Sequence, residues 1–250
     1  MSSRARLDVA VTARGLAPSR ERARRLILAG LVLVDGRRVT QAGTPVREDA
    51  SIEVTAPDHE YVSRGGVKLA GALDALAVDP RDRVCVDVGA STGGFTDCLL
   101  RRGARVVHAV DVGYGQLAWS LRTDPRVRVH ERTNMRHMAP RALDPVPSLA
   151  VVDASFISLD LLLAPTLAQL EAPKEIVALV KPQFEVGKGR VGKGGLVRDP
   201  ADRRAAVDKV VSTAEALGLT VLGIVDSSLA GAKKGNVEVF VHLDSRGARG

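Results

Sequence analysis

Residues 87–95 read Asp-Val-Gly-Ala-Ser-Thr-Gly-Gly-Phe. They end an apolar run, residues 84–88, that is typical of a buried strand, and they lead into residues 95–102, whose pattern predicts a helix. A glycine-rich turn between a strand and a helix lets the backbone approach a ligand closely and places that ligand at the end of the helix. The stretch therefore predicts a nucleotide-cofactor pocket in an α/β domain.

Strands and helices alternate along most of the remaining chain. We expect strands at 84–88, 106–111, 127–130, 149–153, 175–181, 220–225 and 237–243, and helices at about 95–102, 117–121, 159–170 and 201–217. Such alternation predicts a largely parallel sheet covered by helices on both faces. Hydrophobic residues make up 45% of the 250 residues, which is enough for a substantial core. The fold class is therefore α/β.

The identity of the cofactor depends on the acids around the turn. Asp111 ends the next strand, 24 residues (111 − 87) after Asp87, where a carboxylate can accept both ribose hydroxyls. The turn lacks the first G-x-G pair of a nicotinamide site. Asp87 suits the cationic amino-acid end of S-adenosylmethionine better than it suits a pyrophosphate. S-adenosylmethionine is the favoured cofactor, with a nicotinamide cofactor or a purely structural turn as alternatives.

Two lysines and two carboxylates stand at the edges of the expected elements. Asp153 and Lys181 each end a strand, at the carboxyl edge where open α/β sheets bind ligands. Lys68 lies in a helix before the glycine turn, and Glu238 lies in the last strand, where a buried glutamate needs a cationic partner. We interpret these four residues as one catalytic cluster; two surface ion pairs are the alternative.

Such a cluster can activate an alcohol beside the cofactor. A ribose hydroxyl is a poor nucleophile at neutral pH, and lysine becomes a base only when its pKa of ~10.4 is lowered by burial or a second cation. Lys68 can supply that second charge to Lys181, while Asp153 and Glu238 orient the amines. A sulfonium methyl is already activated, so the protein mainly contributes alignment and proton removal.

The first fifth of the chain carries most of the excess positive charge. Residues 1–50 contain ten arginines, no lysine and five acids, which is +5 of the formal net charge of +7. Arginine binds phosphates through two parallel hydrogen bonds and stacks on bases, so the concentration favours RNA over a merely solvated basic face. Helices are expected at 5–13 and 19–29, followed by a strand from residue 31, an Asp-Gly turn, a return strand and a last strand at 52–55.

Residues 4–56 resemble the small RNA-binding domain of a small-subunit ribosomal protein and of many pseudouridine synthases. The resemblance rests on Arg6-Leu-Asp-Val, Arg14-Gly-Leu, Ser19-Arg, Ala23-Arg-Arg-Leu-Ile and Gly30-Leu-Val-Leu-Val-Asp-Gly. It implies that the arginine-bearing helices lie against a structured RNA backbone. Contacts of this kind contribute position and salt-dependent affinity rather than base readout.

The four-residue cluster resembles the Lys-Asp-Lys-Glu tetrad of ribose 2′-O-methyltransferases of the RrmJ/FtsJ type. The segments that begin at Gly89, at Asp111 (Asp-Val-Gly-Tyr-Gly-Gln-Leu-Ala-Trp) and at Lys181 (Lys-Pro-Gln-Phe-Glu-Val-Gly-Lys-Gly) resemble the TlyA (haemolysin A) family. The resemblance implies a Rossmann-like, S-adenosylmethionine-dependent methyltransferase domain that follows a small α+β RNA-binding domain. It also implies action on a ribosomal RNA ribose within assembled subunits, with cytidine as the nucleotide. His59-Glu-Tyr-Val stands where mycobacterial-type members carry an Arg-x-Trp-Val linker.

These considerations give domain bounds and candidate sites. We expect the RNA-binding domain at 1–57, a linker at 58–63 and the methyltransferase domain at 64–250. Arg64 and Arg136 flank the pocket and are expected to hold substrate phosphates, and Asn134 is expected to contact the adenine. The candidate catalytic residues are Lys68, Asp153, Lys181 and Glu238. The candidate cofactor-binding residues are Asp87, Gly89, Ala90, Ser91, Gly93, Phe95, Asp111, Asn134 and Asp153. The candidate RNA-binding residues are Arg4, Arg6, Arg14, Arg20, Arg22, Arg24, Arg64, Arg136 and Lys188.

Several other functions are disfavoured. Residues 187–194 nearly match a P-loop, but glycine replaces the hydroxyl residue that would bind Mg²⁺; this basic loop is instead expected to contact RNA or to be solvated. No signal segment, membrane span or metal-ligand spacing is visible, so we expect a cytoplasmic protein without a bound metal. A pore-forming haemolysin and a catalytically inactive RNA-binding or assembly protein are the remaining alternatives.

Overall fold

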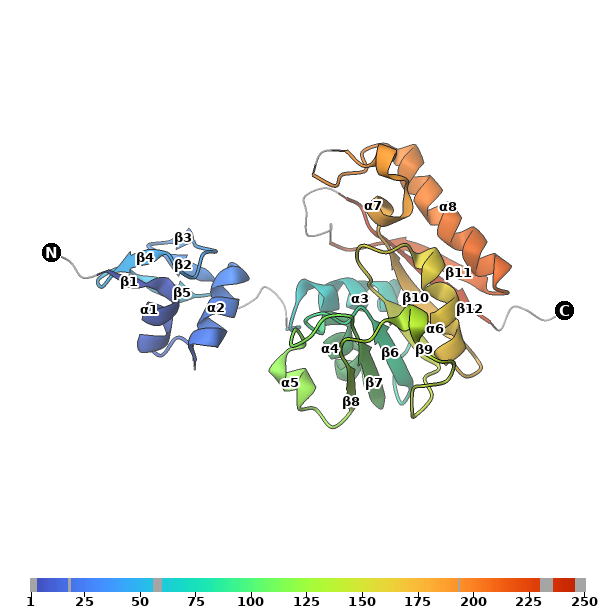
Figure 1. Ribbon diagram of the computed structural model, residues 1–250, viewed down its shortest axis with the longest axis horizontal. Helices are drawn as coiled ribbons and strands as arrows, with labels where there is room; N and C mark the ends of the chain where they lie inside the picture. The colour runs from blue at the N-terminus through green and yellow to red at the C-terminus, as the bar shows by residue number, and fades with distance from the viewer. Residues whose placement is uncertain (1–3, 18, 56–59, 193, 230–235, 246–250) are drawn as a thin grey trace. The chain divides into compact units, whose positions relative to one another are not determined.

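The computed structural model shows two compact units, residues Met1–Glu60 and Tyr61–Gly250 (Figure 1). It describes residues 4–17, 19–55, 60–192, 194–229 and 236–245. The expected linker at 58–63 spans the boundary between the units. Residues 56–59, which include the expected domain boundary and His59, lie outside the described part.

The first unit packs two helices against two small sheets. Strand β1 (Arg4–Arg6) pairs antiparallel with β4 (Pro45–Arg47), and β2 (Val32–Val34) lies between β3 (Arg37–Arg38) and β5 (Ile52–Val54). Helix α1 spans Leu7–Ala13 and α2 spans Arg20–Leu28. The expected helix at 5–13 therefore starts two residues later, because residues 4–6 pair with β4 instead.

The helices of the first unit follow from their apolar spacing and their ends. Leu7 and Val11 on α1, and Ala23 and Ile27 on α2, each lie four residues apart and are buried in one core. The Ser19 hydroxyl accepts a hydrogen bond from the Arg22 amide at 3.2 Å, which caps the start of α2.

The second unit is built on a seven-stranded sheet in the order β11-β12-β10-β9-β6-β7-β8. Five strands are parallel: β6 (Val84–Val88), β7 (Val106–Val110), β8 (Val127–His130), β9 (Leu149–Val152) and β10 (Glu175–Val180). Strand β12 (Val239–Asp244) runs antiparallel to β10 and to the edge strand β11 (Thr220–Asp226). The expectation of a largely parallel sheet is confirmed: of the strands described in this sheet, β12 alone runs in the opposite direction.

Helices cover both faces of this sheet (Figure 1). On one face, α3 (Arg64–Ala75) and α4 (Gly94–Arg101) pack on side chains such as Cys85, Val151 and Leu179. On the other face, α6 (Leu163–Gln169) and α8 (Pro200–Ala216) pack on the alternate positions, such as Val86, Val152 and Val180. Successive residues of a strand point to opposite faces, so each strand contributes to both cores.

In the second unit, three of the expected elements differ from the structure by more than one residue at an end. The helix expected at 117–121 is α5 (Trp119–Arg122), and the one expected at 159–170 is a 3₁₀ turn, η2 (Leu159–Leu161), followed by α6. Strand β12 begins at Val239, so Glu238 stands immediately before the last strand rather than inside it.

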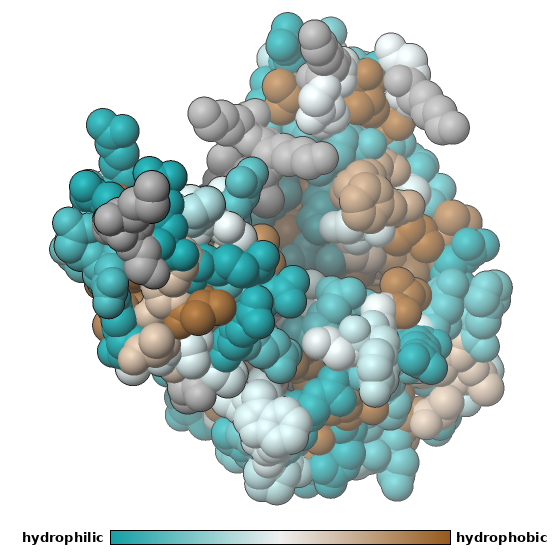
Figure 2. Space-filling view, turned by 60° about the vertical axis from the view of Figure 1, so that its left-hand side comes forward, coloured by the Kyte–Doolittle hydropathy of each residue, from teal (hydrophilic) through white to brown (hydrophobic). Residues whose placement is uncertain are grey.

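Figure 2 shows a mainly hydrophilic surface on which apolar residues form small, separate patches.

Candidate functional site

The sheet register brings the predicted catalytic residues to one rim. Asp153 and Lys181 directly follow β9 and β10, which are adjacent and parallel. Val180 pairs with Val239 on the antiparallel strand β12. Lys181, which follows Val180, and Glu238, which precedes Val239, therefore stand opposite each other one position beyond this pair. Asp153, Lys181 and Glu238 alternate with residues of the opposite core, and they therefore point to the face covered by α3, which carries Lys68.

The four side chains form two ion pairs. The Lys68 ammonium donates to Glu238 Oε2 at 2.5 Å, and the Lys181 ammonium pairs with Asp153 Oδ1. Lys68 and Lys181 are each only 9% exposed, and Glu238 is 4% exposed. Two surface ion pairs, the alternative interpretation, are therefore excluded by the burial of both lysines. Charges buried this deeply require partners, and each lysine has one.

The charges of both ion pairs affect the pKa of Asp153. Burial raises the pKa of Asp153, while the charges of Lys181 and Lys68 lower it and the charge of Glu238 raises it. All three other members of the cluster therefore act on this carboxyl. The sequence prediction that distant residues form a single charged cluster is consistent with this arrangement.

The glycine turn is shaped by its backbone and by its closeness to Asp153. Gly89 and Gly93 have φ values of +87° and +96°, in the left-handed region that favours glycine. A Cβ atom on Gly89 would lie 2.8 Å from the backbone oxygen of Asp153. The turn and the catalytic rim are thus in direct backbone contact, and there is no room for a side chain between them.

Asp87 lies fully buried beneath the turn. Its Oδ2 accepts a hydrogen bond from the Thr96 hydroxyl at 2.7 Å, but its Oδ1 has no partner among the described residues. Burial raises its pKa to about 7; Thr96 opposes this rise, and the charges of Asp153 and Asp111 add to it. An unpartnered buried carboxylate oxygen is costly, and it fits a site that receives a cationic ligand group.

Asp111 connects the turn to the loop after β7. Its Oδ2 accepts from the Ser91 amide at 2.8 Å and its Oδ1 from the Gly113 amide at 2.6 Å. A small hollow next to it is lined in part by Ala90, Ser91 and Gln116. The predicted residues of the turn and Asp111 therefore lie together.

The two remaining cofactor candidates occupy different environments. Asn134 is exposed after β8, where its side-chain oxygen accepts from the Arg136 amide at 3.1 Å. The Phe95 ring instead lies in the core, with its centroid 6.0 Å from that of Phe240. The buried Phe95 side chain is a packing residue, so a cofactor contact from this position would have to use its backbone.

Sequence reasoning gave no role to two residues that follow Asp153. Ser155 Oγ accepts a hydrogen bond from the Lys181 ammonium at 2.9 Å. The Phe156 side chain is 90% exposed, and its φ of +66° is a strained conformation for a bulky residue, of the kind that costs about 1–3 kcal/mol. The ring lies 5.2 Å from that of Phe184. No local sequence signal indicates a left-handed phenylalanine here.

Three of the predicted RNA-binding arginines hold the first unit together. Arg6 and Arg20 both donate to the fully buried Asp8, at 3.0 Å each, and the hydrogen bond from Arg6 is the main reason that the pKa of Asp8 falls to about 2. Arg14 donates to the backbone oxygens of Ala50 and Glu48 at 2.6 Å. The guanidinium groups of these three arginines are thus partly used inside the unit.

The other RNA candidates are more available. Arg4, Arg22 and Arg24 are exposed, and no ion pair of theirs occurs within the described residues. In the second unit, Arg64 begins α3 one turn before Lys68, and Arg136 lies beyond β8 at the same edge; both are exposed. The side chain of Lys188 lies outside the described part.

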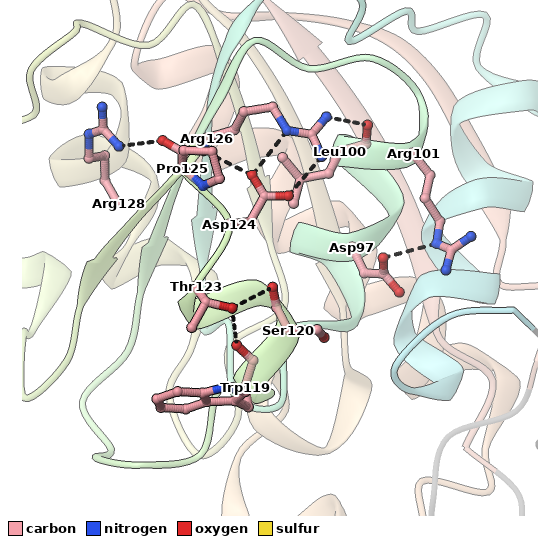
Figure 3. A network of polar contacts seen from close by, with 10 residues as sticks. All are labelled: Asp97, Leu100, Arg101, Trp119, Ser120, Thr123, Asp124, Pro125, Arg126 and Arg128. Atoms are coloured by element: carbon pink, nitrogen blue, oxygen red, sulfur yellow. Dashed lines mark hydrogen bonds and ion pairs between the residues drawn. The ribbon is translucent and has the colours of Figure 1, made fainter.

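Helix α5 is joined to the glycine turn. The Ala118 amide donates to the Thr92 oxygen at 3.1 Å, and Leu121 packs close to Gly93. Figure 3 shows the indole of Trp119 pointing away from the hydrogen bonds of Asp124 that follow the helix. Trp119 is the only tryptophan of the chain and is 69% exposed, so its fluorescence can report on the adjacent cofactor turn.

Comparison with known proteins identifies both units. Residues 61–245 match the FtsJ-like methyltransferase family, and residues 5–52 match the S4 domain. The chain is 50% identical over 244 residues to the 16S/23S rRNA (cytidine-2′-O)-methyltransferase TlyA of Mycobacterium tuberculosis, covering 97% of this chain and 91% of that protein. The chain belongs to the TlyA/hemolysin A family. It is also 39% identical to hemolysin A of Brachyspira hyodysenteriae, over 95% of this chain and 99% of that one.

Solved structures support the family fold. A structure from Streptococcus thermophilus, assigned provisionally as a hemolysin, superposes with a TM-score of 0.75 at 39% identity and covers 98% of this chain and 89% of that one. An RNA methyltransferase candidate from Pyrococcus horikoshii, at 15% identity and a TM-score of 0.52, covers 76% of this chain and 90% of that one and shows the same fold. These matches confirm a Rossmann-like methyltransferase unit that follows a small RNA-binding domain in the sequence.

In the part of the chain that the structure describes, no helix has both the length and the apolarity needed to span a bilayer. The same part of the chain contains no group of three or more histidine, cysteine, aspartate or glutamate side chains arranged to hold a metal ion.

Proposed function

We propose that this family member is an S-adenosylmethionine-dependent methyltransferase that modifies the ribose 2′-hydroxyl of a cytidine in ribosomal RNA. The observation that carries the proposal is the convergence of Lys68, Asp153, Lys181 and Glu238 at one rim, beside the glycine turn. The relatives named as rRNA methyltransferases supply the substrate class. Because ribosomal subunits are the substrate, we place its action in the cytoplasm.

The residues of the turn fit S-adenosylmethionine. The unpartnered, buried Asp87 Oδ1 suits a cationic amino group, and the left-handed glycines keep the backbone free of side chains. Asp111 stands where a ribose could be bound, although its oxygens now accept backbone amides. When bound, the cofactor supplies a methyl group that is already activated by a positively charged sulfur.

The chain's own contribution to the reaction is alignment and proton removal. Once its own proton has passed to Asp153, the neutral Lys181 amine receives the proton of the 2′-hydroxyl at Nζ, and Ser155 and Asp153 hold that nitrogen in place. Because burial raises the pKa of Asp153, the neutral state of the Asp153–Lys181 pair lies closer in free energy to the ion pair than it would in water. The Lys68–Glu238 pair closes the other side of this buried cluster, with the Lys68 ammonium held by Glu238 Oε2.

The raised pKa of Asp87 predicts pH-dependent cofactor binding. Ionised Asp87 attracts a cationic amino group, whereas the protonated form does not. With a pKa of about 7, the ionised fraction rises as the pH increases from 6 to 7.5, so S-adenosylmethionine affinity should increase about eightfold over this range. Titration followed by Trp119 fluorescence or calorimetry would measure the increase. Asp87→Asn should bind more weakly and show no such dependence; an equally steep dependence in that variant would contradict the assignment.

The exposed ring of Phe156 offers a surface on which the target base can stack. Stacking of a base on an aromatic side chain contributes about 1–3 kcal/mol. We therefore expect Phe156→Ala to lower kcat/KM for ribosomal RNA by roughly 5–150-fold, with cofactor affinity unchanged. Phe156→Trp, which keeps an aromatic face, should retain most of the activity. Equal activity of the alanine and tryptophan variants would remove stacking as the role of this residue.

The free arginines of α2 should contribute to RNA binding. Neutralising Arg22 and Arg24 to glutamine should weaken subunit binding and flatten the slope of log affinity against log salt by roughly 1.5–2, because each phosphate contact releases counterions. Arg25→Gln on the same helix is the matched control, because Arg25 is already paired with Glu21. If the double variant keeps the wild-type slope, α2 does not face RNA.

The function itself is tested by incubating the purified protein with each ribosomal subunit and labelled S-adenosylmethionine. A catalytically inactive RNA-binding protein would bind a subunit without transferring a methyl group. Mapping the labelled nucleotide would also distinguish ribose from base methylation and identify the subunit.

A further inference from the structure

A buried carboxylate next to the catalytic rim has no part in the mechanism described so far. Glu185 is the last residue of α7 (Pro182–Glu185), four positions after Lys181, and its side chain is 1% exposed. Its Oε1 accepts a hydrogen bond from the Leu159 amide at 2.8 Å, and its Oε2 accepts from the Ser158 hydroxyl. Glu185 thus joins the segment after β10 to the segment after β9.

A lysine of α8 completes the arrangement. The Lys209 ammonium lies 2.8 Å from Ser158 Oγ, 3.0 Å from Asp160 Oδ2 and 3.5 Å from Glu185 Oε2. We call Ser158, Asp160, Glu185 and Lys209 the Glu185 cluster. It connects three segments, and its buried carboxylate has both hydrogen-bond donors and a counter-charge.

The segments that this cluster joins carry the reacting groups. One runs from Asp153 through Ser155 and Phe156 to Leu159, and the other begins at Lys181. The left-handed Phe156 is a strained conformation that persists only if its surroundings fix it, and the Glu185 contacts begin two residues later. The contact between the Phe156 and Phe184 rings joins the same two segments.

We propose that Glu185 is a positioning residue for methyl transfer. Through Ser158 and the Leu159 amide it holds the Asp153–Phe156 turn in register with Lys181, so that the ammonium, Ser155 and the exposed ring keep their relative places. Glu185 does not touch the substrate or the reacting atoms. The inference rests on the proposed function, because it names what keeps that site in order.

Two mild substitutions test the proposal. Ser158→Ala removes the hydroxyl shared by Glu185 and Lys209. Glu185→Gln removes the buried one of the two carboxylate charges near Lys209 with little change in shape, and Asp160 remains as its other partner. We expect each to lower the single-turnover rate of methyl transfer by 10- to 100-fold at saturating RNA and cofactor, since displacement by about 1 Å can cost that much. The affinities for S-adenosylmethionine and RNA should stay within twofold, and the midpoint of the pH–rate profile should move. Ser158→Thr, which retains the hydroxyl, should recover most of the rate.

The matched control is a buried, paired carboxylate at the start of β10, the strand that leads to Lys181 and α7. Glu175, the first residue of β10, pairs with Arg83 and lies 2.6 Å from His242 Nε2. Glu175→Gln should lower the thermal stability but leave the rate per folded molecule and the pH–rate profile unchanged. If Ser158→Ala and Glu185→Gln behave in the same way as this control, the positioning role is overturned.

A second measurement does not depend on catalysis. Hydrogen–deuterium exchange of residues 153–161 should accelerate in Ser158→Ala and Glu185→Gln, while exchange in β10 stays as in the wild type. Unchanged exchange in that segment would overturn the proposal even if activity fell. Absence of methyl transfer by the wild-type protein, together with accelerated exchange in the variants, would instead overturn the proposed function alone.

Discussion

Lys181→Ala is expected to lower methyl transfer to ribosomal RNA by about 10²–10⁴-fold, the usual contribution of a general base. The residue is 9% exposed, and its ammonium lies against Asp153 and Ser155 at the rim beside the glycine turn. Binding of the subunit should be largely retained, because the free arginines of the first unit are untouched. Filter binding and incorporation of labelled methyl groups measure the two properties separately.

Lys181→Arg separates the role of a base from the role of a charge. Arginine keeps the positive partner of Asp153 but is not deprotonated in proteins, so it should be nearly as inactive as alanine. Substantial activity of the arginine variant would show that position 181 supplies charge and not proton removal. Undiminished methylation by Lys181→Ala would remove the residue from the mechanism altogether.

Gly89→Ala is expected to have the second large effect. The residue has a φ of +87°, and its new Cβ would lie 2.8 Å from the Asp153 oxygen and 3.1 Å from the Ala154 Cα. Both neighbours are backbone atoms, so either the turn or the catalytic rim must move. We expect cofactor affinity and activity to fall at least tenfold and stability to fall by about 1–3 kcal/mol.

Gly115→Ala is the matched control for this substitution. Gly115 also has a positive φ, +68°, but nothing lies within 4 Å of its added Cβ. It should show the backbone strain alone, with a cost of about 1 kcal/mol and nearly normal activity. Equal losses of activity in both variants, measured together with thermal denaturation, would contradict the close contact between turn and rim as the cause.

Most of the sheet could be predicted because its signals are local. The apolar runs at 84–88, 149–152 and 175–180 give buried parallel strands, and the glycine turn marks where the first strand leads into a helix. The convergence of Asp153 and Lys181 followed from their positions at strand ends. Lys68 and Glu238 joined the predicted cluster on weaker signals, a helix before the glycine turn and a glutamate in the last strand, because their closeness depends on how α3 and the antiparallel β12 pack.

What the sequence did not reveal depends on contacts between distant segments. The segment at residues 4–6 is short and carries two arginines, and it forms a strand only because β4 pairs with it. Arg6 and Arg20 were interpreted as free RNA ligands, since nothing local indicates that Asp8 is buried between them. Phe95 directly follows the glycine turn in the sequence, but its ring packs in the core against Phe240.

The central claim is that the Lys-Asp-Lys-Glu rim removes the proton from a ribose 2′-hydroxyl. The most direct test is mapping of the labelled methyl group after the wild-type protein and Lys181→Arg have each been incubated with purified ribosomal subunits. The account predicts 2′-O-methylcytidine at defined positions with the wild type, and almost none with the variant. A methyl group on a base atom, or equal ribose methylation by both proteins, would contradict it.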